Sequence, residues 1–369
     1  MSATELAELT AALVRTESVN PSLDPAGSGE AAAARLVADW ATEHGLRAEL
    51  DELEPGRVNV LVHGGRGGGC TVMLLGHLDT VGGAAMVEPF NGAVRDGRVH
   101  GRGAYDMKGA VAAALVAARD LDRSDLAASV VVACAADEEY ASLGAECLVA
   151  RGARPDFVVV CEPTDERLCV AHRGFAGFEI EVRGRAAHGS RPDLGVDAIA
   201  ATGVILTRLD QLSRDLLARE PHPLLGTPSA HASLVSGGQE FSSYPERCLI
   251  QGERRTLPGE TDDEIAAEVA ALAAGVDATT RLVFSRPPLE TDPSHKLAHA
   301  VAQAAGTASF EGVPFWTDGA LFAAAGIPTV IFGPRGTGAH AAEEWVEVES
   351  LSRCAEVYAE SVRLLATAG

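Results

Sequence analysis

The sequence lacks the long apolar runs that a membrane-spanning protein requires. Its longest apolar stretch, at about 110–118, is rich in alanine and ends at Arg119, well short of the roughly 18 residues that span a bilayer. The first residues are acidic and amphipathic, with neither the basic region nor the apolar region of a signal peptide. We therefore expect no membrane-spanning helix and no signal peptide.

Basic residues are also scarce. The 369 residues include 30 Lys and Arg against 52 Asp and Glu, which gives a formal net charge of −22. Because a chain this acidic repels phosphate groups, nucleic acids and anionic membranes are not expected as partners. The seven cysteines are an odd number at scattered positions, without the spacing of a disulfide framework. We expect a protein of the reducing cytoplasm.

The first 160 residues instead show a regular alternation of strand and helix patterns. Short runs of Val, Leu and Ile, bounded by Gly, Pro or charged residues, predict buried strands at 58–62, 71–75, 129–135 and 157–161. Amphipathic or alanine-rich stretches predict helices at about 6–14, 30–44, 108–121 and 143–151. This alternation is typical of an α/β domain with a mainly parallel sheet.

The pattern changes near Gly177. From there the sequence predicts, in order, a strand at 178–183, a helix at 196–217, strands at 231–236 and 247–255, a helix at 262–274 and a strand at 279–285. This β-α-β-β-α-β order is typical of a ferredoxin-like α+β domain. After Pro287 and Pro288 the α/β pattern resumes. We predict one α/β domain formed by residues 1–176 and 288–369, interrupted by an inserted domain at 177–287.

Acidic residues and histidines follow several of the predicted strands. The candidates are His77, Asp79, Asp106, Glu138, Glu139, Glu162 and, after a glycine-rich turn near the C-terminus, His340. The carboxyl ends of parallel strands meet at one edge of a sheet, where ligands bind, so we expect these side chains to lie together. Clustered carboxylates repel one another unless a cation lies between them. Mixed histidine and carboxylate ligands suit Zn²⁺, with Co²⁺ or Mn²⁺ as alternatives.

Five of these motifs, in this order, resemble those of one family of di-zinc hydrolases. The motifs are Gly76-His77-Leu78-Asp79, Gly101-Arg-Gly-Ala-Tyr-Asp106-Met-Lys-Gly109, Asp137-Glu138-Glu139, Glu162-Pro163-Thr164 and the late His340. The family includes acetylornithine deacetylase, succinyl-diaminopimelate desuccinylase, aminoacylase and glutamate carboxypeptidase. The resemblance extends over nearly the whole chain. It implies a zinc-hydrolase catalytic domain with an inserted lid or dimerisation domain.

The resemblance also implies a metal ligand set. His77 and Glu162 would hold one zinc ion, Glu139 and His340 would hold the other, and Asp106 would bridge both. A site with a single metal ion remains an alternative. Two zinc ions lower the pKa of a bound water towards about 7 and polarise the carbonyl of the scissile bond.

Two further carboxylates receive catalytic roles from the resemblance. Glu138 would be the general base, taking a proton from the metal-bound water and giving it to the leaving amine. Asp79 would hydrogen-bond the ring nitrogen of His77 that does not face the metal, and so fix the tautomer of that histidine.

The inserted domain carries two candidate substrate residues, His188 and Arg255. By resemblance, His188 would stabilise the developing oxyanion, in dimeric members at the neighbouring subunit's site, and Arg255 would pair with a substrate α-carboxylate. The sequence alone also allows His188 to be an ordinary turn residue. It likewise allows Arg255 to be a surface residue that pairs with Glu253 or Glu260.

Two other positions resemble substrate contacts less closely. Ser242 stands where the family usually has an asparagine, three residues before Pro245, and a serine side chain is shorter and donates one hydrogen bond. Thr317 occupies the place of a family Thr or Ser that precedes an Asp near the substrate.

The function expected from these motifs is hydrolysis of an N-acyl amino acid, with loss of the acyl group. A carboxypeptidase or dipeptidase of the same family is the first alternative, because its substrates also carry a free α-carboxylate. A non-catalytic binding protein on the same fold is a weaker alternative, since Glu138 and all five ligand positions are filled. The inserted domain implies a homodimer, although a monomer remains open.

Overall fold

The computed structural model describes residues 2–83 and 86–367. The chain forms two compact units, each of which is described separately below. Unit 1 comprises Met1–Ala171, Glu290–Gly312 and Thr317–Gly369, and unit 2 comprises His172–Leu289 and Val313–Trp316. The role of unit 2 as a lid or a dimerisation domain stays a prediction.

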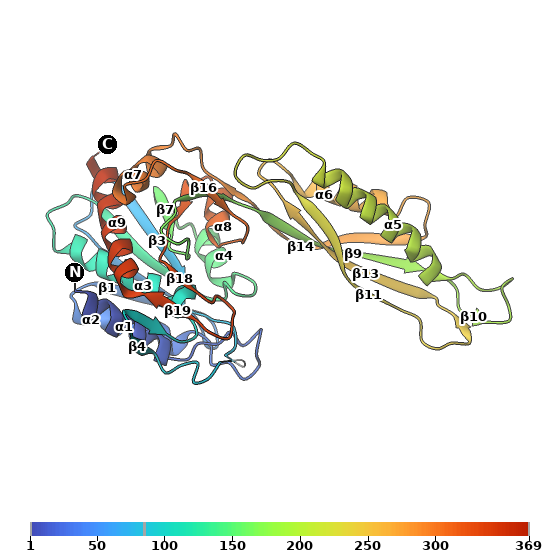
Figure 1. The fold of residues 1–369 in the computed structure, drawn as a ribbon, viewed down its shortest axis with the longest axis horizontal. Coiled ribbons are helices and arrows are strands. Elements are labelled where there is room, and N and C mark those ends of the chain that lie inside the picture. The colour runs from blue at the N-terminus through green and yellow to red at the C-terminus, as the bar shows by residue number, and fades with distance from the viewer. Residues whose placement is uncertain (1, 84–85, 368–369) are drawn as a thin grey trace. The chain divides into compact units, whose positions relative to one another are not determined.

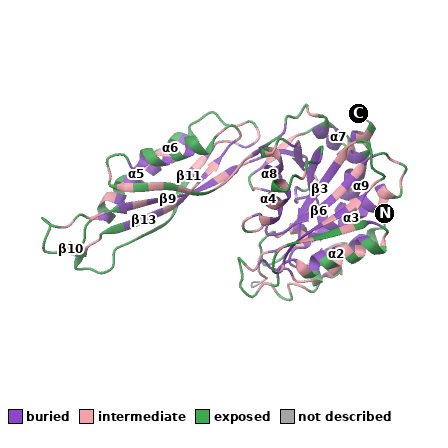
Figure 2. Ribbon diagram, turned by 180° about the vertical axis from the view of Figure 1, so that it is seen from behind, coloured by how far each residue is buried: buried purple, intermediate pink, exposed green. Residues whose placement is uncertain are grey.

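Unit 1 is built around a large mixed sheet. Its strands, in spatial order, are β1 (Arg47–Glu54), β2 (Arg57–Gly64), β6 (Ser129–Ala135), β3 (Thr71–His77), β7 (Phe157–Val160), β17 (Thr329–Ile331), β8 (Cys169–His172) and β15 (Leu289–Glu290), and β16 (Glu311–Val313) pairs with β8. The four central strands β6, β3, β7 and β17 are parallel, as the alternating pattern predicted. They are almost entirely buried (Figure 2). The predicted α/β fold class is therefore confirmed.

The sheet differs from the prediction at its first edge. Strand β2 runs antiparallel to β6, and β1 pairs with β2 as a hairpin across a tight turn that contains Gly56 at φ 83°. The positive φ of Gly56 is the left-handed conformation that glycine adopts readily. Strand β1 was not predicted, because its sequence is rich in acidic residues and its side chains are half-buried or exposed.

Helices pack on the sheet of unit 1 and on one another. They are α1 (Ala3–Arg15), α2 (Ala31–Glu43), α3 (Gly109–Asp122), α4 (Leu143–Ala150), α7 (Lys296–Ala305), α8 (Gly319–Ala324) and α9 (Val348–Thr367). Figure 1 shows α3 and α9 on one side of β3 and β7, and α4 and α8 on the other. Helix α3 is buried on all sides, since its alanines let it lie close to both the sheet and α9. Among the described residues, no helix combines the length and the hydrophobicity needed to cross a membrane.

A second, small sheet in unit 1 joins two distant parts of the chain. Its strands, in order, are β18 (Gly336–Thr337), β19 (Trp345–Glu347), β5 (Arg98–His100) and β4 (Ala93–Arg95). The antiparallel pairing of β19 with β5 places Trp345 opposite His100. The segment that follows His340 therefore lies beside the segment that leads to Asp106.

Unit 2 has its own sheet and core. The antiparallel order is β11 (Ser229–Gly237), β13 (Arg247–Thr256), β9 (Gly174–Arg183) and β14 (Ala278–Arg286), with helices α5 (Ala198–Leu217) and α6 (Asp262–Leu272). Alternate residues of β9, including Phe178, Ile180 and Val182, form a buried core with apolar residues of both helices. A short ladder pairs β10 (Ala187–His188) with β12 (Ser243–Tyr244).

Candidate metal centre

The five predicted metal ligands all lie in unit 1, on five separate segments of the chain. His77 ends β3, Glu139 follows β6, Glu162 follows β7, Asp106 lies in an irregular helical turn at Ala104–Lys108, and His340 lies between β18 and β19. Three of them follow parallel neighbouring strands, as the topology argument required. The other two come from segments that the strand pattern alone did not locate in space.

The first half of the centre surrounds His77, which is buried at the end of β3. Its Nε2 atom lies 3.3 Å from Oδ1 of Asp106 and 3.4 Å from Oε1 of Glu162. Its Nδ1 atom lies 2.9 Å from the backbone oxygen of Asp79 and 3.5 Å from the Asp79 carboxylate. Nδ1 therefore donates to Asp79, mainly to its carbonyl, and Nε2 is left to face the carboxylates.

The second half surrounds His340. Its Nε2 atom lies 2.9 Å from Oε2 of Glu139 and 3.4 Å from Oδ2 of Asp106. The two oxygens of Asp106 thus face different histidines, Oδ1 towards His77 and Oδ2 towards His340. A carboxylate oriented in this way could offer one oxygen to each of two cations.

The electrostatics of these residues reflect burial and mutual contact. Burial raises the pKa of Glu162 to about 7, although the charge of His77 opposes the shift. Hydrogen bonds with Asp106 and Glu139 raise the pKa of His340 to about 10. Burial acts to raise the pKa of Asp106, but hydrogen bonds with His340 and His77 outweigh it and lower that pKa.

The same residues fit divalent metal ions. Ligand atoms of His77, Asp106 and Glu139 lie within 4.8 Å of one another, and so do those of His77, Glu138 and Glu162. Clustered carboxylates whose ionisation is opposed by burial are stabilised when a cation lies among them. Two imidazoles with several carboxylates form a donor set that zinc and neighbouring transition metals accept.

Glu138 lies beside this cluster. Its Oε2 atom is 3.9 Å from Nε2 of His77, and burial raises its pKa well above the usual value. The Asp79 carboxylate accepts hydrogen bonds from the backbone N–H groups of both Glu138 (3.2 Å) and Glu139 (3.1 Å). Asp79 therefore acts on the turn that presents the two glutamates as well as on His77, a contact that the sequence did not indicate.

Glu344 is a buried residue whose role the sequence did not reveal. Its carboxylate accepts hydrogen bonds from the backbone N–H groups of Gly103 (3.1 Å), Tyr105 (3.0 Å) and Asp106 (3.1 Å). It also accepts a bond of 2.6 Å from Nη1 of Arg102, whose Nη2 donates to the Ala341 carbonyl. This arrangement, the Glu344 clamp, joins the segment after His340 to the turn that carries Asp106. The only signal was an acidic residue shortly after His340.

Tyr105 connects the Asp106 turn to the segment that follows Glu162. Its hydroxyl donates to Oδ1 of Asp165 at 3.1 Å. Its ring also lies against Gly336, where a Cβ atom would meet ring carbon Cδ2 at 2.4 Å. Gly336 precedes His340 by four residues. Three ligand-bearing segments therefore meet at this tyrosine.

Unit 2 holds three of the predicted substrate residues. His188 is exposed, with its Nδ1 atom 2.8 Å from the Ser190 hydroxyl. Its ladder partner in β12 is Ser243, directly after the exposed Ser242, whose carbonyl accepts a 2.6 Å bond from the Gly189 N–H group. The structure therefore brings His188 and the segment at Ser242 side by side.

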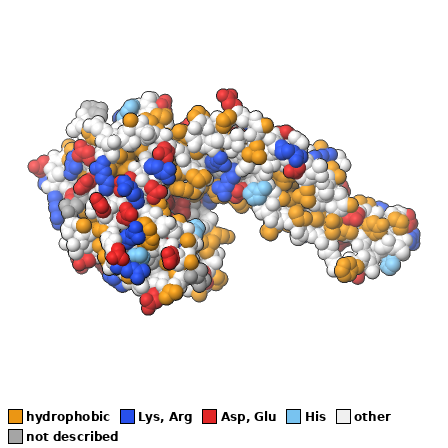
Figure 3. Space-filling model, in the orientation of Figure 1, with side chains coloured by type: hydrophobic (Ala, Val, Ile, Leu, Met, Phe, Trp, Pro, Cys, Tyr) orange, Lys and Arg blue, Asp and Glu red, His pale blue; other side chains and the backbone are white. Residues whose placement is uncertain are grey.

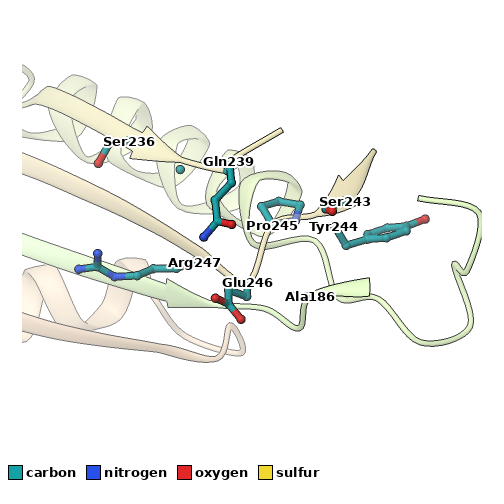
Figure 4. Close-up of a pocket in the computed structure, with 10 residues that line it drawn as sticks. Ala186, Ser236, Gln239, Ser243, Tyr244, Pro245, Glu246 and Arg247 are labelled. Carbon is teal, nitrogen blue, oxygen red and sulfur yellow. The ribbon is translucent and has the colours of Figure 1, made fainter. Parts of the chain in front are cut away.

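A polar recess of about 340 Å³ lies in the same part of unit 2. Figure 4 shows lining side chains from the end of β11, from β12 and from the start of β13. They include Ser236, Gln239, Tyr244, Glu246 and Arg247. The recess therefore adjoins the ladder that carries His188.

Arg255 and Thr317 occupy different settings. Arg255 lies on β13, its Nε atom donates to Glu253 at 2.6 Å, and its guanidinium lies 4.9 Å from the centre of the Phe175 ring. Pairing with Glu253 was one of the two readings of this residue. Thr317 is fully buried in unit 1, directly before Asp318. Burial is the main cause of the raised pKa of Glu138, and the charges of Glu162 and Asp318 add to it.

Comparison with known proteins identifies the family. A model of peptidase family M20/M25/M40 matches residues 73–364. The chain is similar to acetylornithine deacetylases from two bacteria. That of Myxococcus xanthus is 33% identical over 327 residues, which cover 85% of both chains. That of Proteus mirabilis (strain HI4320) is 30% identical over 357 residues, which cover 92% of both chains.

Solved structures share the fold. The aminopeptidase PepT from Bacillus cereus ATCC 10987 has a TM-score of 0.80 at 19% identity, over 99% of both chains. An M20 family metallo-carboxypeptidase from Sulfolobus solfataricus has a TM-score of 0.78 at 17% identity, over 100% of both. The family that the motifs indicated is thus confirmed: the chain belongs to peptidase family M20/M25/M40 and is a metallohydrolase that acts on amide bonds.

Proposed function

We propose that this chain removes the acyl group from an N-acyl amino acid by metal-dependent hydrolysis. The observation that carries the proposal is the arrangement of His77 and His340 on the two oxygens of Asp106, with Glu138 beside them. The two curated relatives compared above are named acetylornithine deacetylases, which supports an acylated amino acid as the substrate. All seven cysteines are free thiols, which supports a place in the cytoplasm.

The donor set supports two Zn²⁺ ions, with Co²⁺ or Mn²⁺ as alternatives. His77 and Glu162 would hold one ion, and Glu139 and His340 would hold the other. Asp106 would give one oxygen to each, in keeping with the way its two oxygens face the two histidines.

Two carboxylates of the chain have separate roles in the proposed hydrolysis. Bound metal ions supply acidification of a water molecule and polarisation of the scissile carbonyl. Glu138 takes the proton of the attacking water and delivers it to the leaving nitrogen, a role that its place beside His77 and Glu162 supports. Asp79 orients His77 and holds the backbone of Glu138 and Glu139.

The remaining predicted residues act on the substrate in this proposal. Arg255 pairs with the α-carboxylate of the substrate, for which the planar guanidinium offers two parallel N–H donors. His188 stabilises the oxyanion, and Ser242 and Thr317 offer hydroxyl groups to the substrate. The pairing of β10 with β12 supports a joint role for His188 and the Ser242 segment.

The first test is a substrate panel assayed on protein of measured metal content. The panel holds N-acetyl, N-succinyl and N-formyl amino acids and simple dipeptides, each with added Zn²⁺, Co²⁺ or Mn²⁺. We expect release of the amino acid from one N-acyl class, loss of activity on chelation and recovery with metal. Arg255→Ala should raise KM for substrates with a free carboxylate by about tenfold or more, since a charge-assisted bond is lost.

Each other outcome of the panel has a defined meaning. Preference for dipeptides would replace the deacylase by the carboxypeptidase or dipeptidase alternative. About one metal ion per chain with full activity would indicate a single-metal site. Ligand binding that survives chelation, without turnover of any compound, would indicate a binding protein.

We also propose that unit 2 joins a second copy of the chain. Strand β11 is an edge strand, and its Leu234 is 63% exposed beside an exposed Val235. Helix α5 exposes Ile199 and Val204, and Figure 3 shows hydrophobic side chains gathered over the strands of unit 2. An unpaired edge strand is complementary to its own copy across a two-fold axis, which favours a homodimer.

The dimer is tested by the particle mass in solution. We expect light scattering to give twice the 38.2 kDa of one chain for the wild type. The Leu234→Lys variant should give the mass of a single chain, because dimerisation would bury the lysine of each chain near the same lysine of the other. The matched control is Leu50→Lys, on the exposed edge strand β1 of unit 1, which should remain dimeric. A monomeric wild type, or a dimeric Leu234→Lys, would contradict the proposal.

A further inference from the structure

A buried asparagine lies behind the turn that carries Glu138 and Glu139. Asn20 follows α1 in the chain and has no exposed surface. Its side-chain Nδ2 donates to Oδ2 of Asp79 at 2.8 Å and to Oδ1 of Asp137 at 2.9 Å. A primary amide has two N–H groups, and here both are given to carboxylates.

The orientation of this amide is determined by its other contacts. The Ser22 N–H group donates to Oδ1 of Asn20 at 2.9 Å, so that oxygen faces away from the two carboxylates. The backbone N–H group of Asn20 donates to the Thr80 carbonyl at 2.9 Å. Because Thr80 directly follows Asp79, the backbone and the side chain of Asn20 both attach to the segment after β3.

The two carboxylates that Asn20 joins hold the turn from different sides. Asp79 accepts from the backbone N–H groups of Glu138 and Glu139. Asp137 begins the turn at φ 72°, a left-handed conformation that is uncommon outside glycine. Nη2 of Arg57 donates to Oδ1 of Asp137 at 2.8 Å, and Glu30 in turn pairs with Arg57.

The charges of Asp79 and Asp137 explain why a neutral hydrogen-bond donor, the Asn20 amide, lies between them. Asp79 and Asp137 are both buried, and Arg57 contacts only Asp137 of the two. A hydrogen-bond acceptor between them would add repulsion, whereas an amide satisfies both without a charge. Asn20 is thus the link between the Arg57 ion pair and the carboxylate that supports Glu138.

We propose that Asn20 is a positioning residue, which holds Asp79 and Asp137 together and thereby sets the positions of Glu138 and Glu139 for catalysis and metal binding. This inference rests on the proposed function. His77 bonds mainly to the backbone carbonyl of Asp79, whereas the Asn20 amide holds the Asp79 carboxylate, which bonds to the Glu139 N–H group. Loss of the amide should therefore displace Glu139, and affect the metal ion shared with His340 more than the one shared with His77 and Glu162.

Two variants test the inference, Asn20→Ala and Asn20→Asp. The first removes the donors, and the second keeps the shape and the Ser22 bond but faces the two carboxylates with an acceptor. We expect each to weaken one of two Co²⁺ equivalents by about 10–100-fold, as for other groups that orient ligands. The second equivalent should bind as in the wild type, and kcat should fall with little change in KM.

The readouts are Co²⁺ titration by absorption and calorimetry, with kinetics on the same samples. Asn91→Asp, the same chemical change at an exposed asparagine, is the matched control and should change nothing. Val362→Ala in the buried face of α9 provides a variant that loses stability without touching the network. Circular dichroism is used to check that each variant is folded. If Asn20→Asp does not fold, Asn20→Ala alone tests the inference.

Two results would overturn the inference. One is wild-type binding of both Co²⁺ equivalents with an unchanged kcat. The other is an equal loss of affinity for both Co²⁺ equivalents that Val362→Ala also shows. That result would mean that Asn20 contributes only to general stability. A wild-type protein that binds no metal would instead contradict the proposed function, so the two failures are distinguishable.

Discussion

Replacement of Glu138 by glutamine should lower kcat by about 10²–10⁴-fold, the usual contribution of a general acid–base group. The amide has nearly the same size as the carboxylate but cannot take a proton from water. The metal content should stay at its wild-type value, since the proposed ligands are five other residues. The measurement is steady-state kinetics with metal analysis of the same preparation.

The control for this prediction is Glu43→Gln, at an exposed position on α2, which should retain full activity. Loss of metal together with activity would make Glu138 a ligand, an arrangement that its proximity to His77 and Glu162 allows. Retention of kcat would remove Glu138 from proton transfer altogether.

Replacement of Glu344 by alanine should have the largest effect on stability. It removes the acceptor of three backbone N–H groups and leaves the guanidinium of Arg102 buried without its carboxylate. Breaking a buried ion pair in this way costs about 3–5 kcal/mol in free energy of unfolding. Because the Asp106 turn is released as well, metal affinity should fall by about 10–100-fold.

Denaturant unfolding and calorimetric titration with Zn²⁺ measure the two effects. Glu343→Ala is a closely matched control, because Glu343 is the exposed neighbour of the buried Glu344. Glu344→Gln retains an oxygen that accepts some of the N–H groups, so its losses should be smaller. Equal stability and affinity in the Glu343 and Glu344 alanine variants would show that the Glu344 clamp is not needed.

Much of the cluster could be predicted because the proposed ligands follow recognisable local patterns. His77, Glu139 and Glu162 lie at the end of a buried apolar strand or within four residues after it, and parallel strands bring such positions to one edge. Asp106 and His340 could be assigned only by resemblance, since neither follows a strand of the main sheet.

The supporting residues could not be predicted, because their partners are remote in the sequence. Glu344 bonds to backbone groups 238 to 241 positions away, and Asn20 to carboxylates 59 and 117 positions away. A local pattern reports strand and helix periodicity but not which backbone N–H groups converge on a carboxylate. Strand β1 was missed for a different reason: its partner β2 is near in the sequence, but its own composition is that of a loop.

The position of β17 has a consequence for the newly synthesised chain. This strand lies between β7 and β8, although β7 and β8 follow each other in the sequence. About 170 residues separate the end of β7 from the start of β17. At the usual translation rate of about 5–20 residues per second, the apolar edge of β7 stays unpaired for roughly 10–30 s before β17 is synthesised. Such an edge readily pairs with other chains, so the growing polypeptide is exposed to aggregation until Thr329–Ile331 leaves the ribosome.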